Sequence, residues 1–385
     1  MFLETTLRRN PKLIETAQKL HQSGQILPDT YVLDLDVIVE NAKKLAKQAQ
    51  ACGIELFYMT KQFGRNPLVA QKIHEAGIEK CVAVDYKEAL VMMEQGLPLG
   101  NVGHLVQIPQ HLLEKIISYG VEYITVYSIE TLKNIALTAK GLNKIQKVLI
   151  KVIDEEDQIY EGQFGGFELE EITELCQATA KLTNVEIAGV TSFPCFLFDG
   201  KSDLALTHNV QTVMRAKEIF KENGIEIKEL NVPSATCSKT IPTIQSIGGT
   251  QGEPGHALTG TTPLHAKMDL PELPGMVYVS EISHNFKGNG YFYGGGYYRR
   301  GNLGEVLVCD KEDSSVKDKV LSFGNESIDY YLSTQEEHVV GSTVLAVFRT
   351  QVFVTRSDVA VVSGIQSGNP KIEGIYTSLG NLIRR

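Results

Sequence analysis

Lys61 stands where an apolar segment gives way to turn residues. Residues 55–59 read as a buried strand, and Gly64, Asn66 and Pro67 follow the lysine. Such residues end a strand, and a proline suits the first turn of the helix that the apolar spacing beyond it predicts. A lysine desolvated at the C-terminal end of a parallel strand has a lowered pKa and can form a Schiff base with a carbonyl group. The alternative is a surface lysine in a loop.

A second stretch combines glycines with hydroxyl side chains. Its members are Gly252, Gly255, Gly260, Thr259, Thr261 and Thr262. Phosphate groups are bound by backbone N–H donors where little side chain covers the chain, which glycines near a helix N-terminus provide. Ser234 and Thr236 precede this stretch and would follow the seventh of eight predicted strands. Barrel enzymes often bind phosphate after their last two strands. Otherwise these glycines only make tight turns.

The elements that position these residues alternate regularly along the chain. Short apolar segments typical of strands are separated by patterns typical of amphipathic helices. The predicted strands are residues 55–59, 80–84, 102–108, 123–126, 147–153, 187–190, 229–232 and one entering Gly252. This alternation implies βαβ units and a parallel sheet, and eight repeats predict a closed (β/α)8 TIM barrel. A doubly wound open sheet is the alternative, although no GxGxxG motif follows the first strand.

The chain divides into three predicted parts. Residues 1–29 predict an N-terminal helical segment, residues 30–266 the α/β barrel, and residues 267–385 a C-terminal β-rich domain. Prolines and a glycine between residues 271 and 275 form the linker. The strand-like segments beyond it are residues 276–283, 304–308, 343–348 and 358–362. Glycine-rich turns separate them, which is typical of a β domain.

Composition limits the partners. The 385 residues carry a net charge of −9 with no dense basic run, which argues against nucleic acid and anionic membranes. No apolar stretch reaches a membrane-spanning length. The six cysteines are scattered, without the spacing of a metal site, so we expect no metal and reduced thiols in a cytoplasmic protein.

Four stretches together resemble the alanine-racemase and amino-acid-decarboxylase class of fold type III pyridoxal-phosphate enzymes, and most specifically its YhfX-like branch. They are residues 33–36 with Asn41, residues 60–61, residues 230–236 and residues 253–260. The resemblance implies pyridoxal 5'-phosphate bound to Lys61 as a Schiff base. It also implies Ser234, Gly255 and His256 at the phosphate, the last two through backbone N–H groups. Arg65 falls where racemases use a tyrosine to touch phosphate, and a guanidinium suits that place.

This chain differs from the alanine racemases at Glu253. The resemblance implies that those enzymes have an arginine at this position. The decarboxylases have glutamate in a Glu-Pro-Gly motif, as this chain does, although His256 replaces their following arginine. A carboxylate beside the ring nitrogen favours the protonated pyridine ring, which withdraws electrons more strongly. The alternative is a solvated turn residue.

Two further positions differ from the racemase pattern. Gln163 stands near the arginine with which racemases orient the substrate, and it can hydrogen-bond a carboxylate without forming the charged fork. Ser192 stands where racemases commonly have histidine. It would touch the edge of the cofactor ring, or cap a helix.

Racemisation needs a second acid–base group opposite the lysine. Residues 288–298 are similar to the racemases' tyrosine turn, and Tyr293 falls at the catalytic tyrosine. In that family the tyrosine enters from the partner subunit, so the resemblance implies a homodimer with shared active sites. Tyr291, Tyr297 and Tyr298 leave the register open, and aromatic packing in a hairpin is the alternative.

We therefore predict a pyridoxal-phosphate-dependent amino-acid racemase, with proton transfer at the α-carbon of an amino acid or amine substrate. A decarboxylase is the first alternative. Glu253 favours it, but Cys309-Asp310 lies in a different surrounding from the decarboxylases' cysteine–aspartate motif. A non-catalytic pyridoxal-phosphate homeostasis protein is the second, and the residues after Ala266 argue against it because those proteins lack a β domain.

Overall fold

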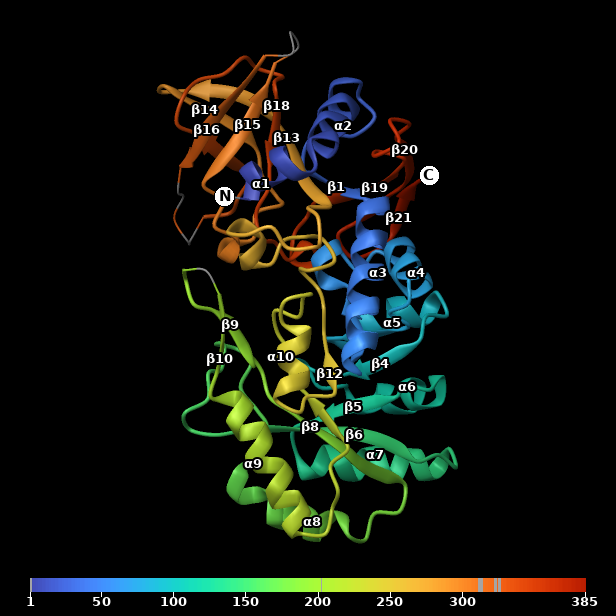
Figure 1. Cartoon of the computed structure of the whole chain (residues 1–385). Helices are drawn as coiled ribbons and strands as arrows, with labels where there is room; N and C mark the ends of the chain where they lie inside the picture. The colour runs from blue at the N-terminus through green and yellow to red at the C-terminus, as the bar shows by residue number, and fades with distance from the viewer. Residues whose placement is uncertain (1, 202, 311–313, 322–323, 325–326) are drawn as a thin grey trace. The chain divides into compact units, whose positions relative to one another are not determined.

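The chain forms two compact units. The computed structural model describes residues 2–201, 203–310, 314–321, 324 and 327–385 (Figure 1). The barrel unit comprises Lys43–Thr60 and Ile73–Gly255. The sheet unit comprises the described residues up to Ala42, together with Lys61–Lys72 and His256–Arg385.

In the described residues of the barrel unit, eight parallel strands close into a ring. They are β2 (Glu55–Met59), β3 (Lys80–Ala83), β4 (Leu99–Val102), β5 (Tyr123–Val126), β6 (Gln146–Ile153), β8 (Val185–Thr191), β11 (Glu229–Asn231) and β12 (Gln251–Gly252). They pair in this order, and β12 pairs with β2 to complete the ring. The predicted (β/α)8 barrel is therefore confirmed, and the open sheet is wrong.

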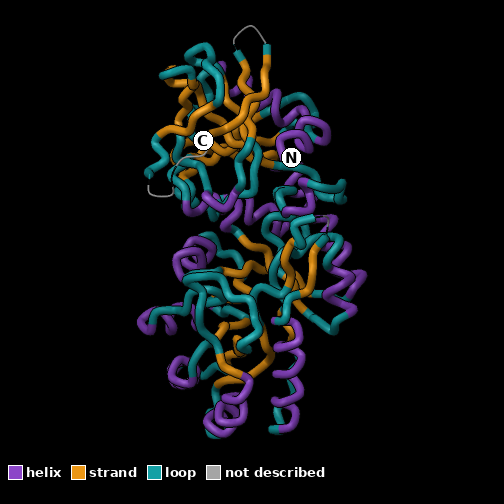
Figure 2. Tube along the Cα trace, turned by 90° about the vertical axis from the view of Figure 1, so that its left-hand side faces the viewer, coloured by secondary structure: helices purple, strands orange, loops and turns teal. Residues whose placement is uncertain are grey.

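Helices of the barrel unit lie outside this ring of strands (Figure 2). The helices between the strands are α4 (Pro67–Glu75), α5 (Tyr86–Glu94), α6 (Leu113–Tyr119), α7 (Ile129–Gly141), α8 (Ile172–Thr179), α9 (Asn209–Glu222) and α10 (Ile241–Ser246), and α3 (Leu35–Cys52) precedes β2. Short strands β7 (Phe167–Glu168), β9 (Phe196–Phe198) and β10 (Leu204–Leu206) lie in the connections. Polar side chains begin the helices locally: Asp85 accepts the backbone N–H of Glu88 at the start of α5.

Apolar side chains fill the interior of the barrel. The cluster contains Phe57, Met59, Val82, Val84, Tyr123, Leu149 and Ala188. Burying each large apolar side chain contributes roughly 1.5–3 kcal/mol. Gly100 on β4 makes room for Phe57, because a Cβ at this position would collide with the Phe57 ring.

One predicted barrel strand is misplaced. Strand β4 ends at Val102, whereas the prediction ran from residue 102 to residue 108. The reason is Gly103, whose φ of +90° turns the backbone out of the strand conformation. The residues beyond Gly103 form a loop that is hydrogen-bonded to the end of the neighbouring strand. In this loop the N–H of Val106 donates to the carbonyl oxygen of Val84.

The sheet unit contains a ten-stranded sheet among its described residues. Its strands are β1 (Thr30–Asp34), β13 (Met276–Phe286), β14 (Asn289–Tyr293), β15 (Glu305–Cys309), β16 (Ser315–Leu321), β17 (Tyr331–Thr334), β18 (Thr343–Ala346), β19 (Asp358–Ser363), β20 (Lys371–Thr377) and β21 (Leu382–Arg384). This confirms the β-rich C-terminal domain. Strand β1 pairs antiparallel with β13 and parallel with β19, so a segment far upstream in the sequence lies inside this sheet.

Two helices at the start of the chain cover part of the sheet. They are α1 (Phe2–Arg9) and α2 (Pro11–Gln22). Asn10 begins α2 by accepting the N–H of Leu13, and the buried face of α2 packs against β13 and β18. Leu13, Ala17 and Val279 belong to the resulting core. In the described part of the chain, no helix is both long and apolar enough to cross a membrane.

Candidate active site

Glu253 is buried at the carboxyl end of the barrel strands. It follows β12 directly, and its residue is 2 % exposed. The N–H of Met59 donates to the carbonyl oxygen of Pro254 over 2.9 Å, which holds this loop beside the end of β2. The N–H of Glu253 donates to Thr236 Oγ1 over 3.0 Å. Glu253 is therefore not a solvated turn residue.

The side chain of Glu253 has a fixed hydrogen-bond donor. Asn231 Nδ2 donates to Glu253 Oε1 over 3.1 Å. Thr191 Oγ1 donates to Asn231 Oδ1 over 2.8 Å, which decides the orientation of the amide. Three neighbouring strand ends thus present one N–H group to one carboxylate oxygen. A carboxylate accepts this bond in its ionised form without rearrangement.

His104 completes this cluster, and its role was missed in the sequence. Its Nε2 lies 3.5 Å from Glu253 Oε2, and its ring meets Phe193 edge-on at 5.5 Å. Tyr127 donates its hydroxyl to the His104 carbonyl oxygen over 2.6 Å. A lone histidine is more often structural or at the surface, so residue type alone does not indicate this contact.

The two serines predicted to touch the cofactor are both engaged by the chain itself. Ser192 is buried and its Oγ accepts from Asn209 Nδ2 over 3.0 Å. Ser234 Oγ donates to the Phe196 carbonyl oxygen over 2.7 Å and accepts the Phe196 N–H over 2.9 Å. A hydroxyl has a single proton, so Ser234 as placed has no further O–H to donate. Its backbone and that of Ala235 both have positive φ.

Gln163 lies beside a buried lysine. Lys151 on β6 donates through Nζ to the Gln163 carbonyl oxygen over 3.1 Å, and its ammonium lies 4.6 Å from the centre of the Tyr127 ring. Burial lowers the pKa of Lys151 to about 8. Gln163 Oε1 is buried and has no hydrogen-bond partner in the described structure. The side chain of Gln163 thus retains acceptor capacity.

Thr60, immediately before Lys61, is held within the barrel unit. Its hydroxyl donates to Glu88 Oε1, and Glu88 Oε2 accepts the N–H of Val84 over 2.7 Å. Glu88 is fully buried near the start of α5. The sequence does not indicate this contact, because a glutamate in the first turn of a helix commonly has only a local capping role.

Lys61 and Arg65 belong to the sheet unit, in and after the 3-10 helix Lys61–Phe63. Lys61 is 8 % exposed, so it is not a surface lysine. Arg65 is also buried, has a φ of 52°, and places its guanidinium 5.0 Å from the centre of the Phe353 ring. Such a cation–π contact stabilises a desolvated guanidinium.

His256, in the same unit, is neutral. Its Nδ1 lies 3.1 Å from Thr261 Oγ1, and its Nε2 is buried without a hydrogen-bond partner among the described residues. Burial lowers its pKa well below the ordinary value, and the positive charges of Arg349 and Lys61 lower it further. Arg349 was not singled out in the sequence. The positive charges of Lys61 and Arg349 therefore act on His256 within the sheet unit.

Tyr293 ends β14 and is 38 % exposed. Its ring centre lies 5.7 Å from that of Tyr331. Tyr291, two residues earlier, is instead stacked on His284 at 4.9 Å. The backbone carbonyl of Tyr293 accepts a hydrogen bond from Ser280 Oγ over 2.6 Å.

The predicted residues are divided between the two units. The barrel unit contains Gln163, Ser192, Ser234, Glu253 and Gly255, and the sheet unit contains Lys61, Arg65, His256 and Tyr293.

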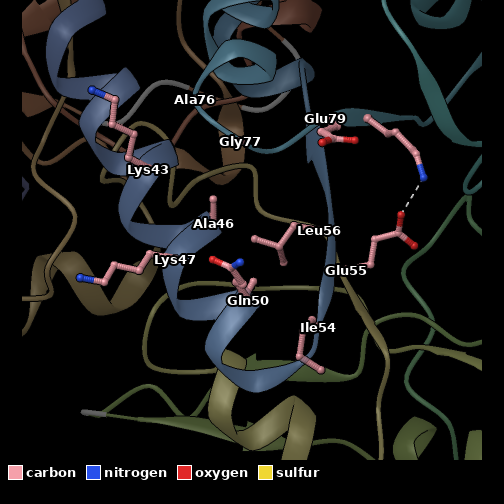
Figure 3. A pocket seen from close by; sticks show the side chains of 12 residues that line it. Lys43, Ala46, Lys47, Gln50, Ile54, Glu55, Leu56, Ala76, Gly77 and Glu79 are labelled. Atoms are coloured by element: carbon pink, nitrogen blue, oxygen red, sulfur yellow. Dashed lines mark hydrogen bonds and ion pairs between the residues drawn. The ribbon is translucent and has the colours of Figure 1, made fainter.

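A cavity of about 520 Å3 lies at the opposite, amino-terminal ends of β2 and β3 (Figure 3). Ala46 and Gln50 of α3 line it together with Leu56. Lys80 and Glu55 also line it and form an ion pair of 2.8 Å. Barrel enzymes carry their chemistry at the carboxyl ends of the strands, so this cavity is not the candidate active site.

Two family descriptions match the chain. Residues 33–263 match the alanine racemase N-terminal domain, and residues 277–372 match the YhfX-like C-terminal domain. The chain therefore belongs to the alanine-racemase-like class of fold type III proteins, in its YhfX-like branch, as the sequence predicted. It is 45 % identical over 383 residues, 99 % of both chains, to the "Uncharacterized protein YhfX" of Escherichia coli (strain K12).

Solved structures share the fold at lower identity. D-threonine aldolase from Filomicrobium marinum is 15 % identical with a TM-score of 0.66, covering 91 % of this chain and 95 % of that one. Alanine racemase of Clostridium difficile 630 is 17 % identical with a TM-score of 0.62, covering 92 % and 99 %. D-threo-3-hydroxyaspartate dehydratase from Delftia sp. HT23 is 15 % identical with a TM-score of 0.66, covering 89 % and 95 %. At these identities the likeness establishes the fold alone.

Proposed function

We propose that this protein is a pyridoxal-phosphate-dependent amino-acid racemase. The alanine-racemase-like family generally binds this cofactor. The observation that carries the proposal is Lys61, buried directly beyond the carboxyl end of barrel strand β2. A buried lysine at that end of a barrel is suited to covalent capture of a carbonyl group.

The residues present fit the cofactor. Lys61 would hold it covalently, and Glu253, an ionisable carboxylate buried in the barrel unit, would face its ring nitrogen. The backbone N–H groups of Gly255 and His256, with the Arg65 guanidinium, would bind its phosphate. The unpartnered Nε2 of neutral His256 supports a ligand at that loop.

Bound there, pyridoxal phosphate supplies an electron sink that stabilises negative charge at the substrate α-carbon. Glu253 would keep a proton on the ring nitrogen, because a carboxylate favours the protonated ring. Ser192 would contact the edge of the ring, and Ser234 the phosphate through its backbone or after its hydroxyl rotates. Gln163 would hydrogen-bond the substrate.

Two groups would move protons at the substrate α-carbon. Lys61 Nζ would serve one face and the Tyr293 hydroxyl the other, since racemisation needs an acid–base group on each side. Tyr293 is 38 % exposed on a single chain, which supports its entry into the active site of a partner subunit in a homodimer.

Each of the six cysteines is a free thiol, which supports a reducing cytoplasmic setting.

A decarboxylase is the second candidate, and Glu253 favours it. Glu253 would serve either reaction, because both develop negative charge at the α-carbon whichever bond breaks. The neighbours named as an aldolase and a dehydratase support the view that this fold accommodates several reactions.

Borohydride reduction followed by peptide mapping tests the cofactor assignment. We expect the pyridoxyl group on Lys61, and its recovery on another lysine would overturn the assignment. The reaction is tested by incubating the loaded protein with a panel of L-amino acids and scoring chiral chromatography together with carbon dioxide release. Formation of a D-enantiomer without carbon dioxide supports racemisation. Release of carbon dioxide would overturn racemisation in favour of decarboxylation.

A further inference from the structure

Three glycines follow Tyr293, and each one is enclosed. A Cβ at Gly294 would collide with the Asp329 carbonyl oxygen, and one at Gly295 with the carboxylate of Asp29. A Cβ at Gly296 would collide with the ring of Tyr278. The backbone of residues 294–296, which we name the glycine turn, therefore lies directly against its neighbours.

Two aspartates lie against this turn, and one of them is hydrogen-bonded to it. Gly295 donates its N–H to Asp329 Oδ2 over 3.2 Å, and Asp329 Oδ1 pairs with Arg356 over 3.0 Å. Arg356 returns its own N–H to the Gly295 carbonyl oxygen over 3.1 Å. On the other side, Asp29 Oδ1 accepts the hydroxyls of Tyr278, over 3.0 Å, and Ser357.

The Tyr278 hydroxyl lies between two acceptors. It is 3.0 Å from Asp29 Oδ1 and 3.2 Å from the carbonyl oxygen of Tyr293. A phenol has one proton and can donate it to only one of them at a time. Burial, followed by the charge of Asp29, raises the pKa of Tyr278 well above its ordinary value, so the phenol retains this proton. The choice of acceptor therefore depends on Asp29.

We propose that the Tyr278 hydroxyl is a hydrogen-bond switch that sets the backbone of Tyr293. With Asp29 ionised, Tyr278 donates to Asp29, and Ser280 alone donates to the Tyr293 carbonyl oxygen over 2.6 Å. With Asp29 protonated, the carboxyl is a weaker acceptor and Tyr278 donates to Tyr293. Asp29 and Tyr278 are thus positioning residues, and their value for catalysis depends on the proposed function of Tyr293.

The surroundings of Asp29 place the switch near neutral pH. Burial raises the pKa of Asp29 to about 6. The hydroxyls of Ser357 and Tyr278 and the charge of Arg356 oppose this rise, and the charge of Asp329 adds to it. Tyr31, on whose pKa the charge of Asp29 also acts, keeps its proton because burial raises that pKa. Asp29 therefore changes charge between about pH 5 and pH 7.

Selective isotope labelling observes this switch without measuring activity. Carbonyl-13C tyrosine and 15N glycine together report only Tyr-Gly peptide bonds, and the chain has two, Tyr119-Gly120 and Tyr293-Gly294. In the full-length, cofactor-loaded protein, we expect the Tyr293 carbonyl signal to shift with a midpoint near pH 6 as its hydrogen bonding changes. The Tyr119 signal is the internal control and should not follow this transition. Tyr293→Phe assigns the two signals.

Three variants decide the outcome. Asp29→Asn retains an oxygen acceptor without titrating, and Tyr278→Phe removes the shared proton, so each should abolish the transition. Glu55→Gln removes a carboxyl of the barrel unit whose pKa burial also raises, and should keep the transition. A Tyr293 signal that is independent of pH, or a transition unchanged in Asp29→Asn or Tyr278→Phe, overturns the switch. The carbonyl signal is read independently of the cofactor, so failure to find a pyridoxyl group on Lys61 would overturn the proposed function and leave the switch standing.

Discussion

Glu253 and Tyr293, one in each unit, are held in opposite ways. The Glu253 side chain is fully buried, and Asn231 fixes one of its oxygens over 3.1 Å. The Tyr293 ring is partly exposed, whereas its backbone carbonyl is hydrogen-bonded by Ser280 over 2.6 Å. In one case the chain fixes the functional atoms, and in the other it fixes the backbone that carries them.

This difference matches the two proposed tasks. A group that controls the protonation of a cofactor ring must keep one position in a desolvated environment, and three strand ends provide it. A group that enters another subunit's active site must leave its hydroxyl uncovered within its own chain. The contrast therefore predicts that variants of Glu253 act within a single chain, and variants of Tyr293 across two.

Tyr293→Phe is expected to have the largest effect, a loss of roughly 10²–10⁴-fold in proton exchange on one face of the substrate, the usual contribution of an acid–base group. The covalent attachment at Lys61 should remain. Exchange of the α-proton for deuterium, resolved by enantiomer, measures this loss. A wild-type rate would remove Tyr293 from the mechanism.

Mixing subunits tests whether this effect crosses chains. Lys61→Ala and Tyr293→Phe are each expected to be inactive alone, whereas a mixed dimer has one active site with both groups intact. Partial recovery of activity on mixing is the expected result. An isolated heterodimer without activity would contradict the shared active site.

Glu253→Gln is expected to slow turnover by about 10²–10³-fold, comparable to removing one electrostatic contact to developing charge. Glutamine can still accept from Asn231, so the fold should be retained. The cofactor spectrum on adding substrate measures the change. Mixing Glu253→Gln with Lys61→Ala subunits should not restore activity, because both residues would serve the same active site of one chain. Restored activity would contradict the view that Glu253 acts within a single chain.

The sequence predicted the parts of this arrangement that depend on local patterns. The alternation of apolar segments predicted that Lys61 follows a strand. The Glu-Pro-Gly motif indicated Glu253 as a cofactor-binding residue. It could not predict contacts between residues far apart in the chain, such as Asn231 and His104 with Glu253. The pairing of β1 with β13 was hidden for the same reason, because strand partners depend on the tertiary fold. The backbone turn at Gly103 ends one strand earlier than predicted, so His104 lies just after that strand and not inside it.

Asp29→Asn tests whether the carboxyl beside the glycine turn titrates with a raised pKa. Burial raises the pKa of Asp29 from 3.8 to about 6, so between these pH values the folded protein binds more protons than the unfolded chain. The free energy of unfolding therefore falls as pH rises through this range, by up to about 3 kcal/mol from this group. In Asp29→Asn, this decrease in the free energy of unfolding with rising pH should be absent. Urea unfolding at pH 4.5 and 7.5 measures it.

Asp269→Asn is the control with the opposite sign. The hydrogen bond from Arg8 lowers the pKa of Asp269, so this carboxylate contributes stability that is lost as pH falls. Its removal should therefore reduce a rise in stability with pH. Equal effects of the two variants would show that the stability change does not come from the buried carboxyl.

The smallest expected effect concerns Thr191, two hydrogen bonds from the nearest oxygen of Glu253. Thr191→Val removes the donor that orients the Asn231 amide, at a cost of roughly 0.5–1.5 kcal/mol in stability. The barrel contains a matched control, because Thr125 Oγ1 donates to Asn101 Oδ1 over 2.9 Å in the same manner. Thr125→Val should cost a similar amount of stability.

The two variants should nevertheless differ in turnover. Only the amide of Asn231 leads to Glu253, so Thr191→Val should slow the reaction by about the few-fold that 1 kcal/mol corresponds to, and Thr125→Val should leave it unchanged. The slowing should vanish when Glu253 is already glutamine, since the two residues act on the same contact. If both threonine variants slow turnover equally, the barrel acts through general rigidity. The fixed carboxylate would then no longer explain the difference between Glu253 and Tyr293.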